Sequence, residues 1–511
     1  MGKRRLAVVQ NIVKIIVEVA VPGLAPSERD RFDRLNKGGQ ALSGARCVIM
    51  AKKKSALSPN RGAEGLSAAA KWLETRALED IECIVPDMAG VARGKMMPVG
   101  KFTDAPRMAL PGSIFLQTIT GEYPEDTDDF PSDAGDGDIL LEPDCSTLCV
   151  VPWASDPTAQ IIHDAYHQDG RPVDIAPRQL LRAVMGLYRA KGWKPIVAPE
   201  LEFYLVERNQ DPDYPLKPPV GRSGRAETGR QSYSLAAVNE FDDLFDDIYD
   251  FSAAQGLEID TLIHEEGAAQ MEINLRHGDP LELADQVFLF KRTIREAALK
   301  HNMYATFMAK PIANEPGSAM HIHQSVVDTK TGKNIFSGKD GKPTPEFFSF
   351  LAGQQKYLPA VMCIMAPYVN SYRRLLRKSI APINVNWGYD NRTVGLRVPN
   401  STPESRRIEN RIPSSDANPY LAIAASLACG YLGMTEGLKP SDPIEGSAYD
   451  LPYDLPRGLL EALELFSESE EISSIFGKGF VSTYRAIKQA EFETFMRVIS
   501  PWEREYLLLN V

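Results

Sequence analysis

Apolar and polar positions follow different spacings along the chain, and these spacings predict where strands and helices lie. Residues 177–193 place apolar side chains on one side of a helix that ends near Gly192. Residues 195–207 instead read as a strand. A loop rich in Pro, Gly and Arg, residues 209–230, separates this strand from an acidic helix over residues 235–256. Strands and helices are therefore expected to interleave in this part of the chain.

The remaining pattern predicts a small β-rich region followed by a larger mixed region. Residues 82–102 read as strand, turn and strand, with Gly90 and Gly94 at the bends. Because the elements do not follow a strict βαβ rhythm, we predict an α+β fold. Further helices are expected at 68–81 and 285–302, further strands at 112–119, 138–143, 146–153, 268–276, 305–312 and 318–326, and a helical C-terminal half after them. The expected division is a poorly ordered extension over 1–64, a first domain over 65–172 and a second over 173–511.

Composition narrows the class of protein. A chain of 511 residues with 43% apolar content can bury more than one core. The net charge of −11 argues against nucleic acid or an anionic membrane as the main partner. The six cysteines are scattered without CxxC pairs, which is typical of a reducing cytoplasm. We therefore expect a cytoplasmic protein with small-molecule ligands.

The first 54 residues differ from the rest of the chain. They carry twelve Lys and Arg against four acids, and they start basic and turn apolar as a secretory signal would. Gln10, Asn11, Lys14 and Glu18 interrupt the apolar run, so neither a signal core nor a membrane span is expected. The prediction is an extension outside the fold, with an upstream start codon or a targeting role as alternatives.

Alternating residues in the predicted strands carry candidate chemistry. His321 and His323 are two residues apart, so both imidazoles face one side of a strand about 7 Å apart. Glu200 and Glu202 share one face of their strand in the same way, and Glu265 lies seven residues before the strand residue Glu272. Burying a carboxylate costs several kcal/mol, about 3 or more, unless a cation compensates it. Converging acids and imidazoles therefore suggest Mg²⁺ or Mn²⁺, although each pair alone also fits a strand with one solvated face.

Arginines offer the complementary chemistry for anions. The sequence contains neither GxxxxGK[ST] nor GxGxxG, so a cradle of glycine amides is not expected to hold phosphate. Arginine forks bind phosphate or carboxylate through two hydrogen bonds and stabilise phosphoryl transfer beside a metal. A solvated, salt-bridged helix face is the alternative for any one of them. The candidates are Arg373, Arg374, Arg392, Arg397, Arg406, Arg407 and Arg411.

An ordered set of motifs gives these residues a context. The chain contains "DMAGVARGK", "PELEFYL", "EEGAAQMEI", "FMAKP", "GSAMHIH", "NSYRRL", "NRTVGLRVP" and "RRIENRIPSSDANPYLA" in that order. In this order and spacing it resembles the glutamine synthetase family over roughly residues 65–511. The resemblance implies an N-terminal β-grasp domain and a larger catalytic domain with a curved antiparallel sheet. It also implies a double hexameric ring in which a neighbouring subunit completes each active site.

The resemblance implies roles residue by residue. Two or more Mg²⁺ or Mn²⁺ ions are expected per active site, one on Glu202, Glu265 and Glu272 and another on Glu200, His321 and Glu409. The phosphates of ATP, a substrate, are expected to meet His323, Ser325, Arg392, Arg397 and Arg407. Glutamate is expected to meet Gly317, His321, Arg374 and Arg411, and Arg374 and Arg392 are the residues assigned to catalysis.

The sequence departs from the family where ammonium would bind. The family has an Asp in an "FDGSS" loop and a Glu before an "AP" pair in a flap, and Pro111 and Ile380 stand in those places here. The loss of both carboxylates predicts a bulkier amine, as in the γ-glutamylpolyamine and γ-glutamylmonoamine synthetases of bacterial polyamine catabolism. The acidic run 121–138 is expected to attract the amine or to be a solvated loop. Pro316 replaces the family's Asn before Gly317, a departure in the loop for glutamate.

The expected activity is therefore ATP-dependent ligation of glutamate to an organic amine through γ-glutamyl phosphate. Two alternatives remain open at this point. One is a glutamine synthetase that uses ammonia, and the other is a catalytically silent ring with a structural or regulatory role.

Overall fold

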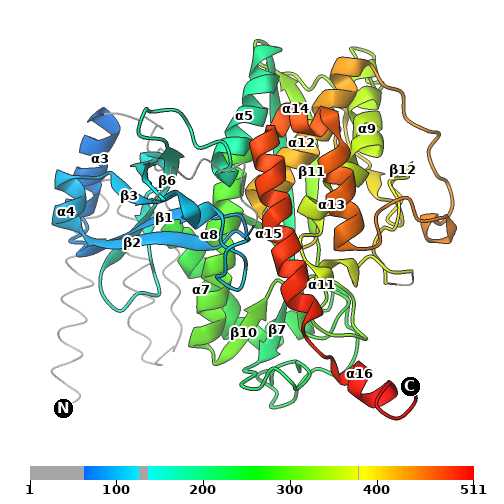
Figure 1. Ribbon diagram of the computed structural model, residues 1–511, viewed down its shortest axis with the longest axis horizontal. Helices are drawn as coiled ribbons and strands as arrows, with labels where there is room; N and C mark the ends of the chain where they lie inside the picture. The colour runs from blue at the N-terminus through cyan, green and yellow to red at the C-terminus, as the bar shows by residue number, and fades with distance from the viewer. Residues whose placement is uncertain (1–62, 126–135, 378) are drawn as a thin grey trace, which may run out of the picture. The chain divides into compact units, whose positions relative to one another are not determined.

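The computed structural model describes residues 63–125, 136–377 and 379–511 (Figure 1). Most of the predicted N-terminal extension and part of the acidic run 121–138 lie outside these ranges. Helix α3 (Ala63–Glu74) opens the described part. The helix predicted over 68–81 is wrong at its C-terminal end, because Asp80 and Ile81 already pair within strand β1 (Asp80–Pro86).

The first region is built on a six-stranded sheet with the order β2-β1-β6-β4-β3, in which β5 also pairs with β6. Its neighbours are antiparallel except for the parallel pair β1 and β6. The assignment as a β-grasp domain remains a prediction. The other elements are β2 (Ala92–Pro98), α4 (Val99–Asp104), β3 (Met108–Pro111), β4 (Asp138–Pro143), β5 (Cys149–Val150) and β6 (Thr158–Tyr166).

Three local expectations in this region are corrected. Residues 112–119 do not form a strand, because Gly112–Phe115 form a 3-10 helix. The strand predicted over 146–153 is reduced to β5. Gly94 lies inside β2 rather than at a bend, and a Cβ there would lie 1.9 Å from the Cys83 carbonyl oxygen of β1. The glycine is therefore required by close approach of two strands.

The second region is built on an eight-stranded sheet with the order β12-β13-β14-β11-β7-β9-β8, with β10 paired to β7 (Figure 1). All pairs are antiparallel except β12 with β13. Its strands are β7 (Trp193–Glu207), β8 (Ile259–His264), β9 (Gln270–Leu275), β10 (Met303–Thr306), β11 (Met320–Asp328), β12 (Trp387–Tyr389), β13 (Leu396–Val398) and β14 (Ile408–Asn410). The α+β class is confirmed. The predicted helical C-terminal half is corrected in one respect, because the short strands β12, β13 and β14 lie within it.

Helices pack on this sheet and on one another. Helices α5 and α8 contact β7, and α12 contacts α5, α8 and α9. The α9–α12 contact is close because Gly433 faces the backbone of α9, where a Cβ would lie 2.1 Å from the Ser349 carbonyl oxygen. The helices are α5 (Pro177–Ala190), α6 (Leu235–Val238), α7 (Asp242–Gln255), α8 (Pro280–Lys300), α9 (Pro345–Tyr357), α10 (Met362–Met365), α11 (Val369–Tyr372), α12 (Pro419–Glu436), α13 (Leu459–Glu468), α14 (Glu470–Phe476), α15 (Lys478–Met496) and α16 (Pro501–Tyr506).

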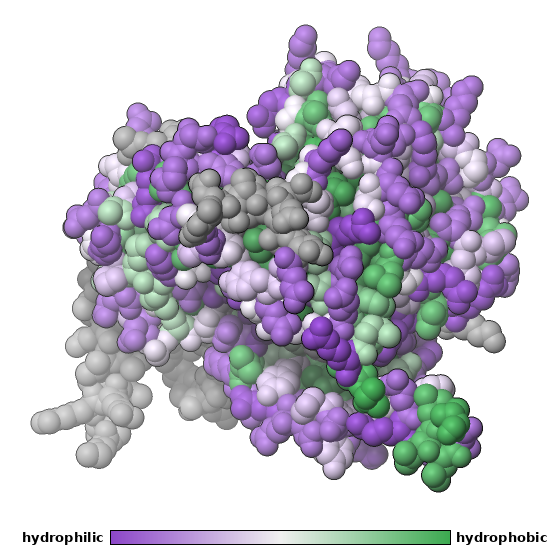
Figure 2. All heavy atoms as spheres, viewed as in Figure 1, coloured by the Kyte–Doolittle hydropathy of each residue, from purple (hydrophilic) through white to green (hydrophobic). Residues whose placement is uncertain are grey.

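The described surface has one conspicuous apolar end. In the part of the chain that the structure describes, no helix has the length and apolar character needed to cross a membrane. Figure 2 shows apolar side chains gathered at α16 and the C-terminus, at the lower right of the view. Trp502, Leu508, Leu509 and Val511 are all exposed there.

Candidate active site

Neighbouring strands of the second sheet bring the predicted chemical residues into one row. On β7, Glu202 lies opposite Glu272 of β9, and Glu200 lies opposite His321 of β11. The row continues where His323 lies opposite Glu409 of β14. We call Glu272, Glu202, Glu200, His321, His323 and Glu409, together with Glu265 just after β8, the ligand strip. Antiparallel register therefore converts motifs far apart in sequence into one continuous site.

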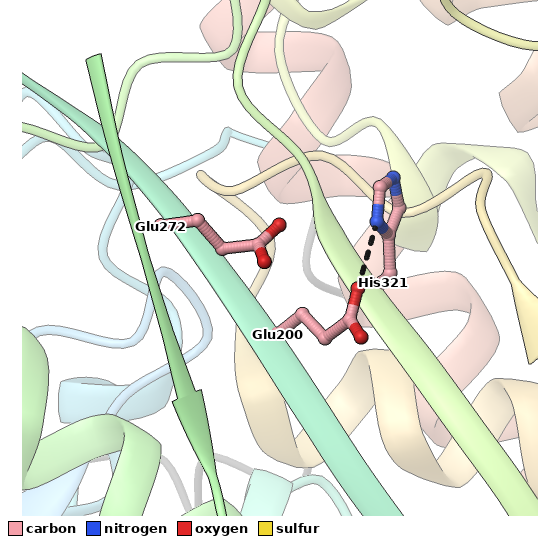
Figure 3. Close-up of side chains that lie close together, drawn as sticks. All are labelled: Glu200, Glu272 and His321. Atoms are coloured by element: carbon pink, nitrogen blue, oxygen red, sulfur yellow. Dashed lines mark hydrogen bonds and ion pairs between the residues drawn. The ribbon is translucent and has the colours of Figure 1, made fainter. Parts of the chain in front are cut away.

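Glu200 is the centre of the strip and contacts both histidines. Its Oε2 lies 3.2 Å from His321 Nδ1 and its Oε1 lies 2.7 Å from His323 Nε2. Although burial opposes the charge, hydrogen bonds from the two imidazoles hold the pKa of Glu200 well below its usual range. Figure 3 shows Glu200, Glu272 and His321 projecting toward one another from three strands.

His323 is fixed between a cation and an anion. Arg407 donates from Nε to His323 Nδ1 over 3.1 Å, so Nδ1 must accept. The ring proton then lies on Nε2, which donates to Glu200. At His321, burial and then the nearby charge of Arg411 lower the pKa of the imidazole to about 4. His321 is therefore neutral at physiological pH, with Nδ1 donating to Glu200 and Nε2 3.9 Å from Glu202 Oε1.

The end of the strip at β9 gathers acids. Burial and the charge of Glu265 raise the pKa of Glu202 to about 8. Burial and the charges of Glu200, Glu202 and Glu265 likewise raise the pKa of Glu272 well above its ordinary value. Burial is also the main cause that raises the pKa of Glu265. This donor set of oxygens and a neutral imidazole fits a hard divalent cation, which would offset the repulsion.

Among the described residues, two groups of three side chains could hold a metal ion, because the ligand atoms within each group all lie within 4.8 Å of one another. The first group is Glu200, Glu272 and His321, and the second is Glu200, His323 and Glu409. Neither group contains Glu202 or Glu265. The division of the ligands between two ions that the family resemblance implies therefore remains a prediction.

The end of the strip at β14 gathers arginines. Glu409 Oε2 accepts from Arg397 Nη1 over 2.7 Å, and its Oε1 accepts from Arg411 Nη1 over 2.5 Å. Although burial opposes its charge, Arg411 and the two histidines lower the pKa of Glu409 to about 2. The buried Nε atoms of both arginines have no hydrogen-bond partner among the described residues. Each retains an N–H that suits an anionic ligand.

The loop before β11 lies against this site. Ala319 donates its backbone N–H to Glu202 Oε2 over 2.8 Å. A Cβ at Gly317 would lie 2.6 Å from both the Ala309 carbonyl oxygen and Arg374 Cγ, so the glycine permits close packing. The guanidinium of Arg374 is buried and donates to the carbonyl oxygens of Arg411 and Ile412. In this conformation Arg374 positions backbone, and its predicted contact with glutamate remains a prediction.

Four other predicted residues have different surroundings. Ser325 follows His321 and His323 on the same face of β11. Arg392 is exposed between β12 and β13, where its charge lowers the pKa of Glu265 less than burial raises it. Pro111 ends β3 of the other sheet, whereas Ile380 is exposed in the predicted flap with a φ of 60°. A positive φ is strained for a β-branched residue and marks the flap as a special conformation.

The sequence patterns did not predict three residues that support the strip. Gln270 Nε2 lies 3.4 Å from Glu202 Oε2 and Asn274 Nδ2 lies 3.1 Å from Glu272 Oε1. Tyr204 follows Glu200 and Glu202 on β7, and its hydroxyl donates to the Pro316 carbonyl oxygen over 2.8 Å. The period of two was a usable signal, because each residue is two positions from a predicted ligand.

Comparisons with known proteins agree with this geometry. A family model described as "Glutamine synthetase, catalytic domain" matches residues 174–507. The chain is 35% identical over 443 residues to gamma-glutamylputrescine synthetase PuuA of Escherichia coli strain K12, covering 84% of this chain and 92% of that protein. It is also 35% identical over 447 residues to a glutamate–isopropylamine ligase of a Pseudomonas species, covering 84% and 95%.

A solved structure has the same fold over most of the chain. GmaS without ligand matches with a TM-score of 0.73 and 27% sequence identity, covering 86% of this chain and 99% of that chain.

Proposed function

Because this chain belongs to the glutamine synthetase family, we propose that it joins the γ-carboxylate of glutamate to an organic amine in an ATP-dependent reaction. The protein is a glutamate–amine ligase, and γ-glutamyl phosphate is its activated intermediate. Its similarity to enzymes named for putrescine and isopropylamine supports an organic amine as the second substrate. An amine-using enzyme of this kind belongs to polyamine or amine catabolism in the cytoplasm.

The observation that carries this proposal is the contrast along the ligand strip. Carboxylates with raised pKa values lie at one end. At the other end lie two arginines whose Nε atoms have no hydrogen-bond partner in the part of the chain that the structure describes. The acids are suited to cations and the arginines to phosphate oxygens. A site that binds both is suited to transfer of a phosphoryl group.

The residues of the strip fit Mg²⁺ or Mn²⁺. Glu200, Glu202, Glu265, Glu272, His321 and Glu409 are the residues that would hold two or more ions. Bound ions would offset the charge of the phosphates and of the transferring phosphoryl group. Arg397, Arg407 and His323 would orient the same phosphates.

The reaction then proceeds in two balanced steps. A γ-carboxylate oxygen of glutamate attacks the terminal phosphorus of ATP, the bond to the bridging oxygen breaks and ADP leaves. The amine nitrogen attacks the acyl carbon, phosphate leaves and the nitrogen loses a proton. Conversion of the carboxylate oxygen into phosphate replaces a poor leaving group with a good one.

Ile380 and Pro111 are the proposed determinants of the amine. Both residues stand where the glutamine synthetase motifs have a carboxylate. An apolar side chain at such a position favours an alkyl group over ammonium. Pro111 lies on the first sheet, so we assign it to the active site of a neighbouring subunit in a double hexameric ring. The exposed apolar residues of α16 and the C-terminus offer a surface for assembly.

An amine panel tests the proposed function. Phosphate release is measured with glutamate, ATP and Mg²⁺ plus putrescine, spermidine, isopropylamine, ethanolamine or ammonia, and reactions without glutamate provide the blank. We expect at least one organic amine to give a higher kcat/KM than ammonia. Turnover with ammonia equal to or above every organic amine would make the protein an ordinary glutamine synthetase. A protein that binds Mg²⁺–ATP but turns over no amine would be a silent relative.

A further inference from the structure

Tyr204 extends the row of functional residues on β7 by one more step. Glu200, Glu202 and Tyr204 alternate along the strand and share one face. The tyrosine is fully buried, although it carries a polar hydroxyl. A buried hydroxyl of this kind needs a hydrogen-bond acceptor within the protein.

The acceptor is the backbone of the loop before β11. Tyr204 donates to the Pro316 carbonyl oxygen over 2.8 Å, and Gln270 Nε2 donates to the next carbonyl oxygen, that of Gly317, over 3.1 Å. Two residues after Gly317, the Ala319 N–H donates to Glu202. Three hydrogen bonds, at Pro316, Gly317 and Ala319, thus tether this loop to β7 and β9.

The space around the hydroxyl admits little movement. Gly267, which follows β8, is buried, and a Cβ there would lie 1.9 Å from the Tyr204 hydroxyl oxygen. Gly317 in turn packs against the stem of Arg374. Pro316 and Gly317 remain only half-buried, so part of their surface is open to a ligand. A loop whose backbone is fixed by hydrogen bonds and close packing, and which is still partly exposed, has the properties of a preorganised binding surface.

We propose that Tyr204 is a positioning residue of the glutamate subsite, which holds the Pro316–Gly317 backbone in the conformation that receives glutamate. The proposal rests on the proposed function and on the contact with glutamate that the family resemblance implies for Gly317. Tyr204 acts through the loop and does not touch the reacting atoms. Loss of the hydroxyl leaves the ring in place and frees the carbonyl, so glutamate must order the loop when it binds.

The matched control is Tyr188. It is also fully buried, and its hydroxyl donates to the Leu427 carbonyl oxygen of α12 over 2.7 Å. Tyr188 lies on α5, which carries no residue of the strip. Tyr188→Phe and Tyr204→Phe therefore each remove one buried bond of the same kind, and only the second lies beside the site.

The experiment compares steady-state kinetics and melting temperatures of the wild type and the two variants of the full chain. We expect Tyr204→Phe to raise the KM for glutamate about three- to tenfold, with kcat and the KM values for ATP and amine changed less than about twofold. Tyr188→Phe should leave all kinetic constants unchanged, and both variants should lower Tm by similar amounts. Equal KM values for glutamate in the two variants would overturn the proposal.

Failure of the proposed function gives a different result. In that case the wild type itself turns over no amine, and glutamate is titrated calorimetrically into the wild type and Tyr204→Phe with Mg²⁺–ADP present. Weaker binding to Tyr204→Phe alone would retain the positioning role, whereas equal or absent binding would overturn it.

Discussion

At the β14 end of the ligand strip Glu409 pairs with two guanidinium groups. At the β9 end Glu202 and Glu272 lie opposite one another and pair with no guanidinium group among the described residues. Burial opposes ionisation at both ends. Arg411 and the two histidines nevertheless lower the pKa of Glu409 to about 2, while burial and Glu265 raise that of Glu202 to about 8. The same residue type on two strands of one sheet therefore has opposite protonation behaviour.

The difference indicates which half of the site depends on a ligand. The β14 end is neutralised by the protein's own side chains and is preorganised before any substrate arrives. The β9 end has an excess of negative charge that a divalent cation would offset. Glu200 joins the two ends, because it contacts His323 on one side and belongs to a group with Glu272 on the other.

Removal of Glu272 should have the largest effect on activity. Glu272→Ala deletes a proposed metal ligand, and we expect kcat/KM for glutamate–amine ligation to fall by more than about 100-fold. Assembly and secondary structure should be unchanged, because burial and the neighbouring acids already disfavour the charged form of this side chain in the metal-free fold. Light scattering and circular dichroism check these two properties.

The control for this loss is Glu258→Ala. Glu258 is a solvent-exposed acid whose side chain is 66% accessible in its pair with Arg276. It should keep full activity. More than a tenth of wild-type activity in Glu272→Ala would contradict a role for Glu272 as a ligand.

Neutral substitutions at the two ends should separate them by stability. Glu409→Gln leaves Arg397 and Arg411 facing an uncharged amide, and we expect a loss of about 3 kcal/mol in the free energy of unfolding. Glu272→Gln replaces a carboxyl that already favours its protonated form, so the metal-free protein should change by less than about 1 kcal/mol. Unfolding in EDTA at pH 7 measures both. Equal losses would show that the two ends do not differ in compensation.

The outline of the site was accessible from sequence because it depends on a period of two. A spacing of two residues in a strand places Glu200 and Glu202 on one face, and it does the same for His321 and His323, whatever the position of their strands in the sheet. Strands β7, β9 and β11 are long enough to show this pattern. The three-residue strands β12, β13 and β14 are too short for any periodicity, so the pairing of His323 with Glu409 was not predictable from spacing.

Contacts that depend on the register between strands could not be predicted from the sequence either. Arg407 reaches His323 only because β14 pairs with β11 in one register. The 3-10 helix at Gly112–Phe115 was not predicted for another reason, because its four apolar or small residues are compatible with several local structures. Tyr204 is an intermediate case, because its position in the alternation was visible but its acceptor, the Pro316 carbonyl, was not.

The dependence of stability on pH gives the finest test of the comparison. Glu202 has a pKa of about 8 in the folded protein against an ordinary value of 4.5, so between these values the folded state binds more protons than the unfolded state. The contribution of Glu202 to the free energy of unfolding is fully present below pH 4.5 and is lost as pH rises through 8. The pKa of Glu409 has the opposite shift, so its contribution is present above pH 4.5 and is lost as pH falls toward 2.

Thermal unfolding of wild type and Glu202→Gln between pH 5 and pH 8 tests the β9 end. Glu409 stays charged throughout this window, and the variant retains the other groups that titrate in it, among them His321 and Lys291, whose pKa values are lowered. In EDTA we expect the Tm of wild type to fall by a few degrees, roughly 2–5 °C, relative to that of Glu202→Gln as pH rises. Mg²⁺ should reduce this difference, since the ion binds the deprotonated carboxylates and stabilises the folded state most at high pH. A difference in Tm that stays constant or changes in the opposite direction over this window would mean that Glu202 is already compensated within the protein, and the distinction between the two ends would fail.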